Sequence, residues 1–166
     1  GASLVVHGQH DSLTIEANEV HEDVGRAAGG CWGIAVDPGY GSRPEAFSRV
    51  LIRGNLVRNV GNVAIGVAAC RDCLIENNVI IQQQPASSFH SIGIAAPNRV
   101  RQLDDQSMDR VRIRNNSLWF GADSAGTAIR LRGEGASHEL ASNAAEYAGT
   151  GNFLCFDVDP AEAGYA

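Results

Sequence analysis

Charged side chains that could act on a substrate gather in and beside two long segments, residues 37–49 and 95–110. Glycoside hydrolysis needs two carboxylates that flank the scissile bond. Elimination from a uronate needs a base for the proton α to the carboxyl group, and a cation that neutralises the carboxylate. The sequence offers both kinds of group, without a recognisable hydrolase motif. The candidate catalytic residues are Arg71, Asp72, Asp104, Asp105 and Arg130.

Other side chains near these segments could bind a substrate. The candidates, which combine hydrogen-bonding, cationic and aromatic groups, are Asp37, Tyr40, Arg43, Arg99, Arg101, Arg132 and Trp119. Glu45 could line the same region. The alternative for each charge is a solvated loop residue, and for Trp119 packing beneath a loop.

The metal requirement is open. A Ca²⁺ site needs several clustered oxygen ligands, and Asp104–Asp105 is the adjacent acidic pair within a long segment. The stretch "HGQHD" places His7, His10 and Asp11 together; no further clear ligand is near in the sequence, although stacking of the turns could bring one in. Ca²⁺ is therefore the cofactor to test, and no other cofactor is indicated.

Composition limits the function. The chain has 166 residues, a net charge of −6 and 44% hydrophobic residues, which suits one domain over 1–166 with a real core. The acidic balance argues against nucleic acid and anionic membranes as partners. All 13 basic residues are Arg, which excludes a Lys nucleophile. The start at Gly-Ala-Ser leaves open that the chain is a fragment of a longer protein.

Four cysteines, Cys31, Cys70, Cys73 and Cys155, do not form a zinc-binding set. The first interpretation is that the four cysteines are free thiols buried in the core. A local disulfide between Cys70 and Cys73 in a secreted protein is the second interpretation, and metal or redox chemistry the third.

The elements that must position these residues are revealed by an internal repeat. An Asn recurs in similar surroundings, with Ile or Leu three residues earlier and an apolar residue two residues later; the Asn residues are Asn18, Asn55, Asn78, Asn116 and Asn143. Such alternation is typical of strands with one inward face. Stacked Asn amides in a turn can hydrogen-bond to one another, which predicts an asparagine ladder.

A second column of inward pairs precedes each Asn segment. The pairs are Leu4/Val6, Ile34/Val36, Ile65/Val67, Ile92/Ile94 and Ile129/Leu131, with Phe156/Val158 as a less regular sixth. The sequence therefore predicts an all-β solenoid, a parallel β-helix of five to six rungs with three short strands each.

The outward position two residues before each Asn tests this alignment. It reads Glu16, Arg53, Glu76 and Arg114 along four rungs, so the charges alternate in sign. Opposite charges on neighbouring strands stabilise a sheet. We therefore predict that these side chains stack as a charged ladder.

The segments "IRGN", "IENN" and "IRNN" resemble the coils of the right-handed parallel β-helix superfamily typified by pectate lyases, over about residues 3–158. The resemblance identifies the coil and no particular activity. It implies a right-handed β-helix that binds polymer across its first strands and flanking loops, and it implies that an Arg could act as base.

The two long segments are predicted to leave the same edge of the coil and to form a trough with Arg71–Asp72 as its floor. The neighbouring outer face would carry small residues, among them Ala35, Gly66 and Gly93. The leading hypothesis is a polysaccharide-active protein, a lyase acting on a uronate-containing glycan, outside the cell or on its surface. The alternative is a non-catalytic stalk, adhesin, phage-fibre or assembly module that forms homo-oligomers through its coil ends or a bare face.

Overall fold

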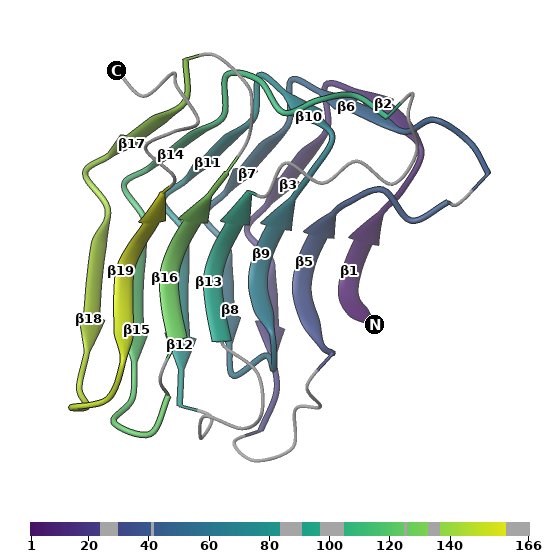
Figure 1. The fold of residues 1–166 in the computed structure, drawn as a ribbon. Helices are drawn as coiled ribbons and strands as arrows, with labels where there is room; N and C mark the ends of the chain where they lie inside the picture. Colours follow the sequence, from purple (N-terminus) through teal and green to yellow (C-terminus); the bar gives the residue numbers. More distant parts are fainter. Residues whose placement is uncertain are drawn as a thin grey trace.

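The fold is built from strands in four parallel sheets (Figure 1). The computed structural model describes residues 1–23, 30–40, 42–83, 91–96, 105–124, 126–132 and 137–158, and all regular structure in this part of the chain is β. The first sheet contains, in spatial order, β1 (Ala2–Val6), β5 (Trp32–Val36), β9 (Val63–Val67), β13 (Ser91–Ala96), β16 (Gly126–Leu131) and β19 (Phe153–Val158).

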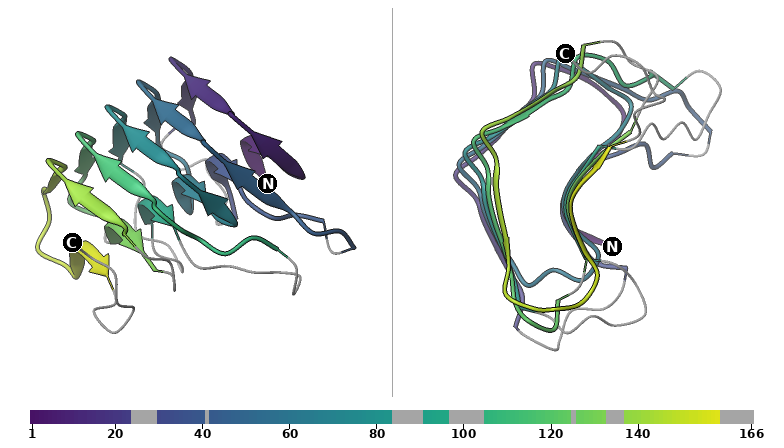
Figure 2. Two further views of the ribbon diagram at one scale, coloured as in Figure 1. Left: turned by 90° about the horizontal axis from the view of Figure 1, so that it is seen from above. Right: turned by 60° about the vertical axis from the view of Figure 1, so that its left-hand side comes forward.

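In the other three sheets, too, the strands of successive turns lie side by side. The second sheet contains β2 (Gln9–Asp11), β6 (Ala46–Ser48) and β10 (Cys70–Arg71). The third contains β3 (Thr14–Glu16), β7 (Leu51–Arg53), β11 (Leu74–Glu76), β14 (Arg112–Arg114) and β17 (Glu139–Ala141). The fourth contains β4 (Glu19–His21), β8 (Leu56–Arg58), β12 (Val79–Gln82), β15 (Ser117–Phe120) and β18 (Ala144–Tyr147). Successive turns of the chain therefore stack strand on strand, as in a parallel β-helix (Figure 2).

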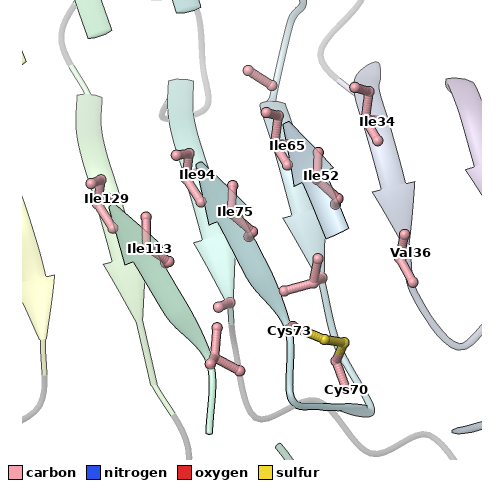
Figure 3. Close-up of a cluster of buried hydrophobic side chains, with 14 of the residues drawn as sticks. Ile34, Val36, Ile52, Ile65, Cys70, Cys73, Ile75, Ile94, Ile113 and Ile129 are labelled. Carbon is pink, nitrogen blue, oxygen red and sulfur yellow. A yellow bond between two sulfur atoms is a disulfide. The ribbon is translucent and has the colours of Figure 1, made fainter. Parts of the chain in front are cut away.

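The core consists of aliphatic columns from opposing sheets. Ile34, Ile65, Ile94 and Ile129 of the first sheet face Ile52, Ile75 and Ile113 of the third, and all are fully buried (Figure 3). Burial of one such side chain contributes roughly 1.5–3 kcal/mol. The same residue type recurs at each level because each level offers the same space.

The predicted asparagine ladder is confirmed. The backbone N–H and Nδ2 of Asn55 donate to Asn78 Oδ1 at 3.0 and 2.9 Å, and Asn78 donates in the same way to Asn116. The residue before each ladder Asn has a positive φ, between 53° and 62°, which turns the chain at this corner. Gly54 occupies one of these positions, where its lack of a Cβ removes the steric cost.

The charged ladder on the third sheet is also confirmed. Arg53 Nε lies 2.8 Å from Glu16 Oε1, and Arg114 Nε lies 3.0 Å from Glu76 Oε2. Each pair is partly exposed and contributes little by itself. The pairing supports the predicted register of the third sheet.

The second sheet is an addition to the three strands per turn that the sequence predicts. Its strands have only two or three residues and lie in segments predicted to be linkers. In each turn of the coil, the corner that leads into the third sheet contains a residue with positive φ; these residues are Ser12, Arg49, Asp72, Arg110 and Ser137. The turns that carry β2, β6 and β10 therefore have four strands each, one more than predicted.

The predicted alignment of β13 is wrong by two residues. Ile94, and not Ile92, pairs with Ile65 of β9, and Ala96 pairs with Leu131 of β16. Gly93 faces the interior, because a Cβ built there would lie 2.4 Å from Leu118 Cδ2. Gly93 is therefore not part of a small-residue outer face.

Cys70 and Cys73 form a disulfide and both are fully buried. The first expectation of buried thiols is wrong for this pair, while Cys31 and Cys155 are free. The bridge closes the turn between the second and third sheets (Figure 3). The described part of the chain contains no helix long and apolar enough to cross a membrane.

Candidate functional site

The outer surface of the first sheet is concave, because the sheet curves toward the coil interior (Figure 2). Trp32, Val63 and Ile92 form one outward row, and Ala35, Gly66 and Ala95 a second. Both rows become more polar or exposed in the last two turns. We call this surface the first-sheet groove; its residues are Val5, Trp32, Ala35, Val63, Gly66, Ile92, Ala95, Thr127, Arg130, Leu154 and Asp157.

Trp32 covers part of the small-residue floor. A Cβ on Gly66 would lie 2.5 Å from Trp32 Cζ3, so the indole rests directly on the glycine of the next turn. Trp32 also packs against a small apolar cluster, separate from the core, that consists of Val63, Ile92 and Ala95. Trp32 is not among the residues predicted from the sequence, and its position directly before Gly33 and Ile34 was the available signal.

A hollow of about 230 Å³ lies beside Trp32 at the N-terminal end of the first-sheet groove. Its side-chain lining comes mainly from Val5, His7, Trp32, Ala35 and Asp37. Asp37, a predicted binding residue, is therefore at the groove. Tyr40, also predicted, lies next to it, with its ring centroid 5.4 Å from that of His7.

His7 is held in one orientation. Its Nδ1 lies 2.6 Å from the backbone carbonyl oxygen of Asp37, and a carbonyl can only accept, so Nδ1 carries a proton. Glu45 Oε1 is 4.0 Å from the same nitrogen. A Cβ on Gly39 would lie 2.2 Å from His7 Cε1, which shows how tightly the loop fits the ring. Nε2 is the ring nitrogen that remains for a ligand.

Glu45 and Asp105 have structural contacts where the sequence suggested a substrate-facing role. The fully buried Glu45 carboxylate accepts from the backbone N–H groups of Gly8, Gly39 and Tyr40, at 2.5 to 2.7 Å. Asp105 Oδ1 accepts from the Glu45 backbone N–H at 2.8 Å. These carboxylates connect the first turn and both long segments.

Arg71 and Asp72 lie at the turn between the second and third sheets. Asp72 accepts from Arg110 Nε and Nη2 at 2.5 and 2.9 Å, and Arg71 Nε is 3.6 Å from Asp109 Oδ2. The structure thus brings Arg71 and Asp72 together, in ion pairs with the next turn. It does not place them on the first-sheet groove.

The hydrogen bond from Arg110, supported by its charge, lowers the pKa of Asp72. A carboxyl group with a lowered folded-state pKa stabilises the fold above its unfolded pKa, and this contribution disappears as the pH falls through the folded-state pKa. We expect Arg110→Ala to raise the pKa of Asp72 toward its ordinary value, as followed by NMR of the carboxyl carbon. Arg112→Ala should move it less, because Arg112 acts only through distant charge. Equal shifts in both variants would contradict this cause.

Arg130 and Arg132 meet at the C-terminal end of the first-sheet groove. Arg130 Nε is 2.7 Å from Asp157 Oδ2, and Arg132 forms an ion pair with the other oxygen. A second hollow of about 270 Å³ adjoins Arg130, Thr127 and Leu154. The carboxylate of Asp157 thus contacts two guanidinium groups.

The remaining predicted residues are dispersed. Trp119 lines a hollow of about 310 Å³ on the fourth sheet, on the wall opposite the first-sheet groove (Figure 2), and Arg43 is exposed. Arg99, Arg101 and Asp104 lie outside the described residues. His10 contacts the His7 carbonyl and Asp11 pairs with Arg49. Within the described ranges, no three His, Cys, Asp or Glu side chains are grouped to hold a metal ion.

Comparisons with protein-family models, with curated proteins and with solved structures found no match.

Proposed function

We propose that the chain is a right-handed parallel β-helix of five to six rungs, similar to the pectate lyases, that binds a polysaccharide along the first-sheet groove. The observation that carries the proposal is the concave, largely apolar surface with Trp32 on its floor and a hollow near each end. Ligand sites are typically concave and apolar with a few placed polar groups. An extended polymer fits a surface that repeats from turn to turn.

A uronate lyase is the activity that fits the C-terminal end of this groove. Arg130 and Arg132 both form ion pairs with Asp157, and their guanidinium groups are of the kind that binds a substrate carboxylate. Neutralising that carboxylate makes the α proton easier to remove. The Cys70–Cys73 disulfide supports an extracellular or cell-surface location, because disulfides persist in oxidising environments.

The second candidate is a non-catalytic β-helix module, such as a stalk, adhesin or phage-fibre segment. It is favoured by the ion pairs and hydrogen bonds that engage Arg71, Asp72 and Asp105. Exposed apolar side chains in the last described turn, Leu154 and Phe156, would suit assembly with further copies. Under this reading the first-sheet groove binds and does not react.

The test is a panel of uronate-containing and neutral polysaccharides, with and without Ca²⁺, assayed for unsaturated products and for chain cleavage. We expect unsaturated ends from a uronate polymer and loss of most turnover in Arg130→Ala. Arg112→Ala, an exposed arginine on the third sheet, should behave as wild type. Binding without turnover would establish the module instead, and the absence of both would refute the proposal.

A further inference from the structure

Trp32 provides a fixed aromatic surface. Its indole rests on Gly66 and packs against the apolar cluster of Val63, Ile92 and Ala95, while part of the residue lines the hollow at the N-terminal end of the groove. Aromatic side chains offer a flat apolar face to the C–H groups of a ring, and a rigid one loses little entropy on binding. A pyranose ring is a ligand with such a face.

His7 supplies a fixed polar group at the edge of the same hollow. Its Nδ1 proton is committed to the Asp37 carbonyl, so in neutral His7 the Nε2 lone pair accepts a hydrogen bond. The ring cannot turn easily, because Gly39 and Tyr40 pack against it. A hydroxyl group on the rim of a sugar is a suitable donor.

The charge around this hollow differs from that at the other end of the groove. Asp37 is the acidic residue among those that line the hollow, and no described Arg lines it. Arg130 and Arg132 lie at the opposite end. A uronate carboxylate would face like charge beside Trp32, whereas an uncharged sugar would not.

We infer that the hollow between Trp32 and His7 is a subsite for a neutral sugar residue, with the ring stacked on the indole and a hydroxyl group donating to His7 Nε2. The inference rests on the proposed function. It assigns different chemistry to the two ends of the groove: neutral sugar at the N-terminal end, and uronate at the Arg130–Arg132 end. The ligand is then a mixed glycan, or a uronate chain with a neutral branch or terminus.

The test uses the fact that the chain has two tryptophans. In a Trp119→Phe background, Trp32 fluorescence is followed while neutral gluco-, galacto- and xylo-oligosaccharides are titrated beside uronate oligosaccharides of matched length. We expect a saturable signal from at least one neutral series, with at least tenfold weaker binding of the uronates at this site. Failure of every neutral series to change the signal would overturn the inference.

Variants give a second readout by calorimetry. Trp32→Leu keeps an apolar contact with Gly66 but removes the flat ring, and should weaken neutral-sugar binding at least tenfold while the melting temperature stays close to wild type. His7→Ala should weaken it about threefold to tenfold, as expected for loss of one hydrogen bond. Trp119→Ala is the matched control and should bind normally. Unchanged affinity in both groove variants would contradict the subsite.

The outcomes separate this inference from the proposed function. If a uronate glycan binds in an Arg130-dependent manner while neutral sugars do not, the groove stands and the neutral subsite falls. If neutral sugars bind only through Trp119, on the fourth sheet, both assignments to the first-sheet groove fail.

Discussion

Replacing Asn78 with Ala should lower the free energy of unfolding by roughly 2–4 kcal/mol, because buried polar groups lose their partners. Asn78 is fully buried, and its Oδ1 accepts from the backbone N–H and Nδ2 of Asn55. Its Nδ2 donates to the Ile52 carbonyl at 3.0 Å. Both neighbouring turns are therefore left with unpaired polar groups in a buried site.

Asn18→Ala is the matched control, with the same residue type in the same ladder. Asn18 lies at its half-exposed end, and the Asn18 backbone N–H can still donate to Asn55 Oδ1 after the change. We expect a loss below about 1 kcal/mol. Chemical unfolding of both variants measures the difference, and equal losses would mean that the ladder does not stabilise the fold through its buried members.

Glu45→Ala should have an effect of similar size, roughly 3–5 kcal/mol, because three backbone N–H groups lose one buried acceptor. Those donors, in Gly8, Gly39 and Tyr40, come from the first turn and the 37–45 loop. Removing the carboxylate should release the loop that holds His7 and Asp37. Sugar binding at Trp32 should weaken along with stability.

Amide hydrogen exchange distinguishes this local effect from general unfolding. In Glu45→Ala the amides of Gly39 and Tyr40 should exchange much faster, while those of β9 remain protected. Glu19→Ala, which removes an exposed carboxylate from β4, should change neither. Retained protection at Gly39 and Tyr40 would contradict the role given to Glu45.

The third and fourth sheets were predictable because their sequence signal repeats without interruption. Asn55, Asn78 and Asn116 have an Ile three residues earlier and an apolar residue two later, so only one alignment satisfies all three. The charges at Glu16 and Arg53 independently supported it. Periodicity and charge together therefore determined the register of two sheets.

The first sheet was harder because β13 permits two alignments. Its sequence SIGIAA places an Ile inward whether Ile92 or Ile94 is aligned with Ile65. Contact between Gly93 and Leu118, from another sheet, decides between them. The second sheet was missed because strands of two or three residues are too short to display alternation.

The sequence indicated which residue types could form a site, but it did not indicate which side chains would contact one another. The pairing of Asp72 with Arg110 joins residues 38 positions apart, on neighbouring turns. This separation in the sequence depends on the length of the inserted segment. The repeat therefore does not determine which charged loop residues form ion pairs with one another. The outward position of Trp32 could not be predicted, because strict alternation from the inward Ile34 would place it in the core.

The asparagine ladder has a direction. From Asn18 to Asn116, Nδ2 of each ladder Asn donates to Oδ1 of the Asn in the following turn, so the side chains from Asn55 to Asn143 each accept from the preceding one. The amide dipoles therefore add along the coil axis, with their oxygen ends toward the first turn. Hydrogen bonds in such a chain polarise one another. A change at one central Asn should consequently alter the electronic environment of amides several turns away, and the column behaves as one extended dipole.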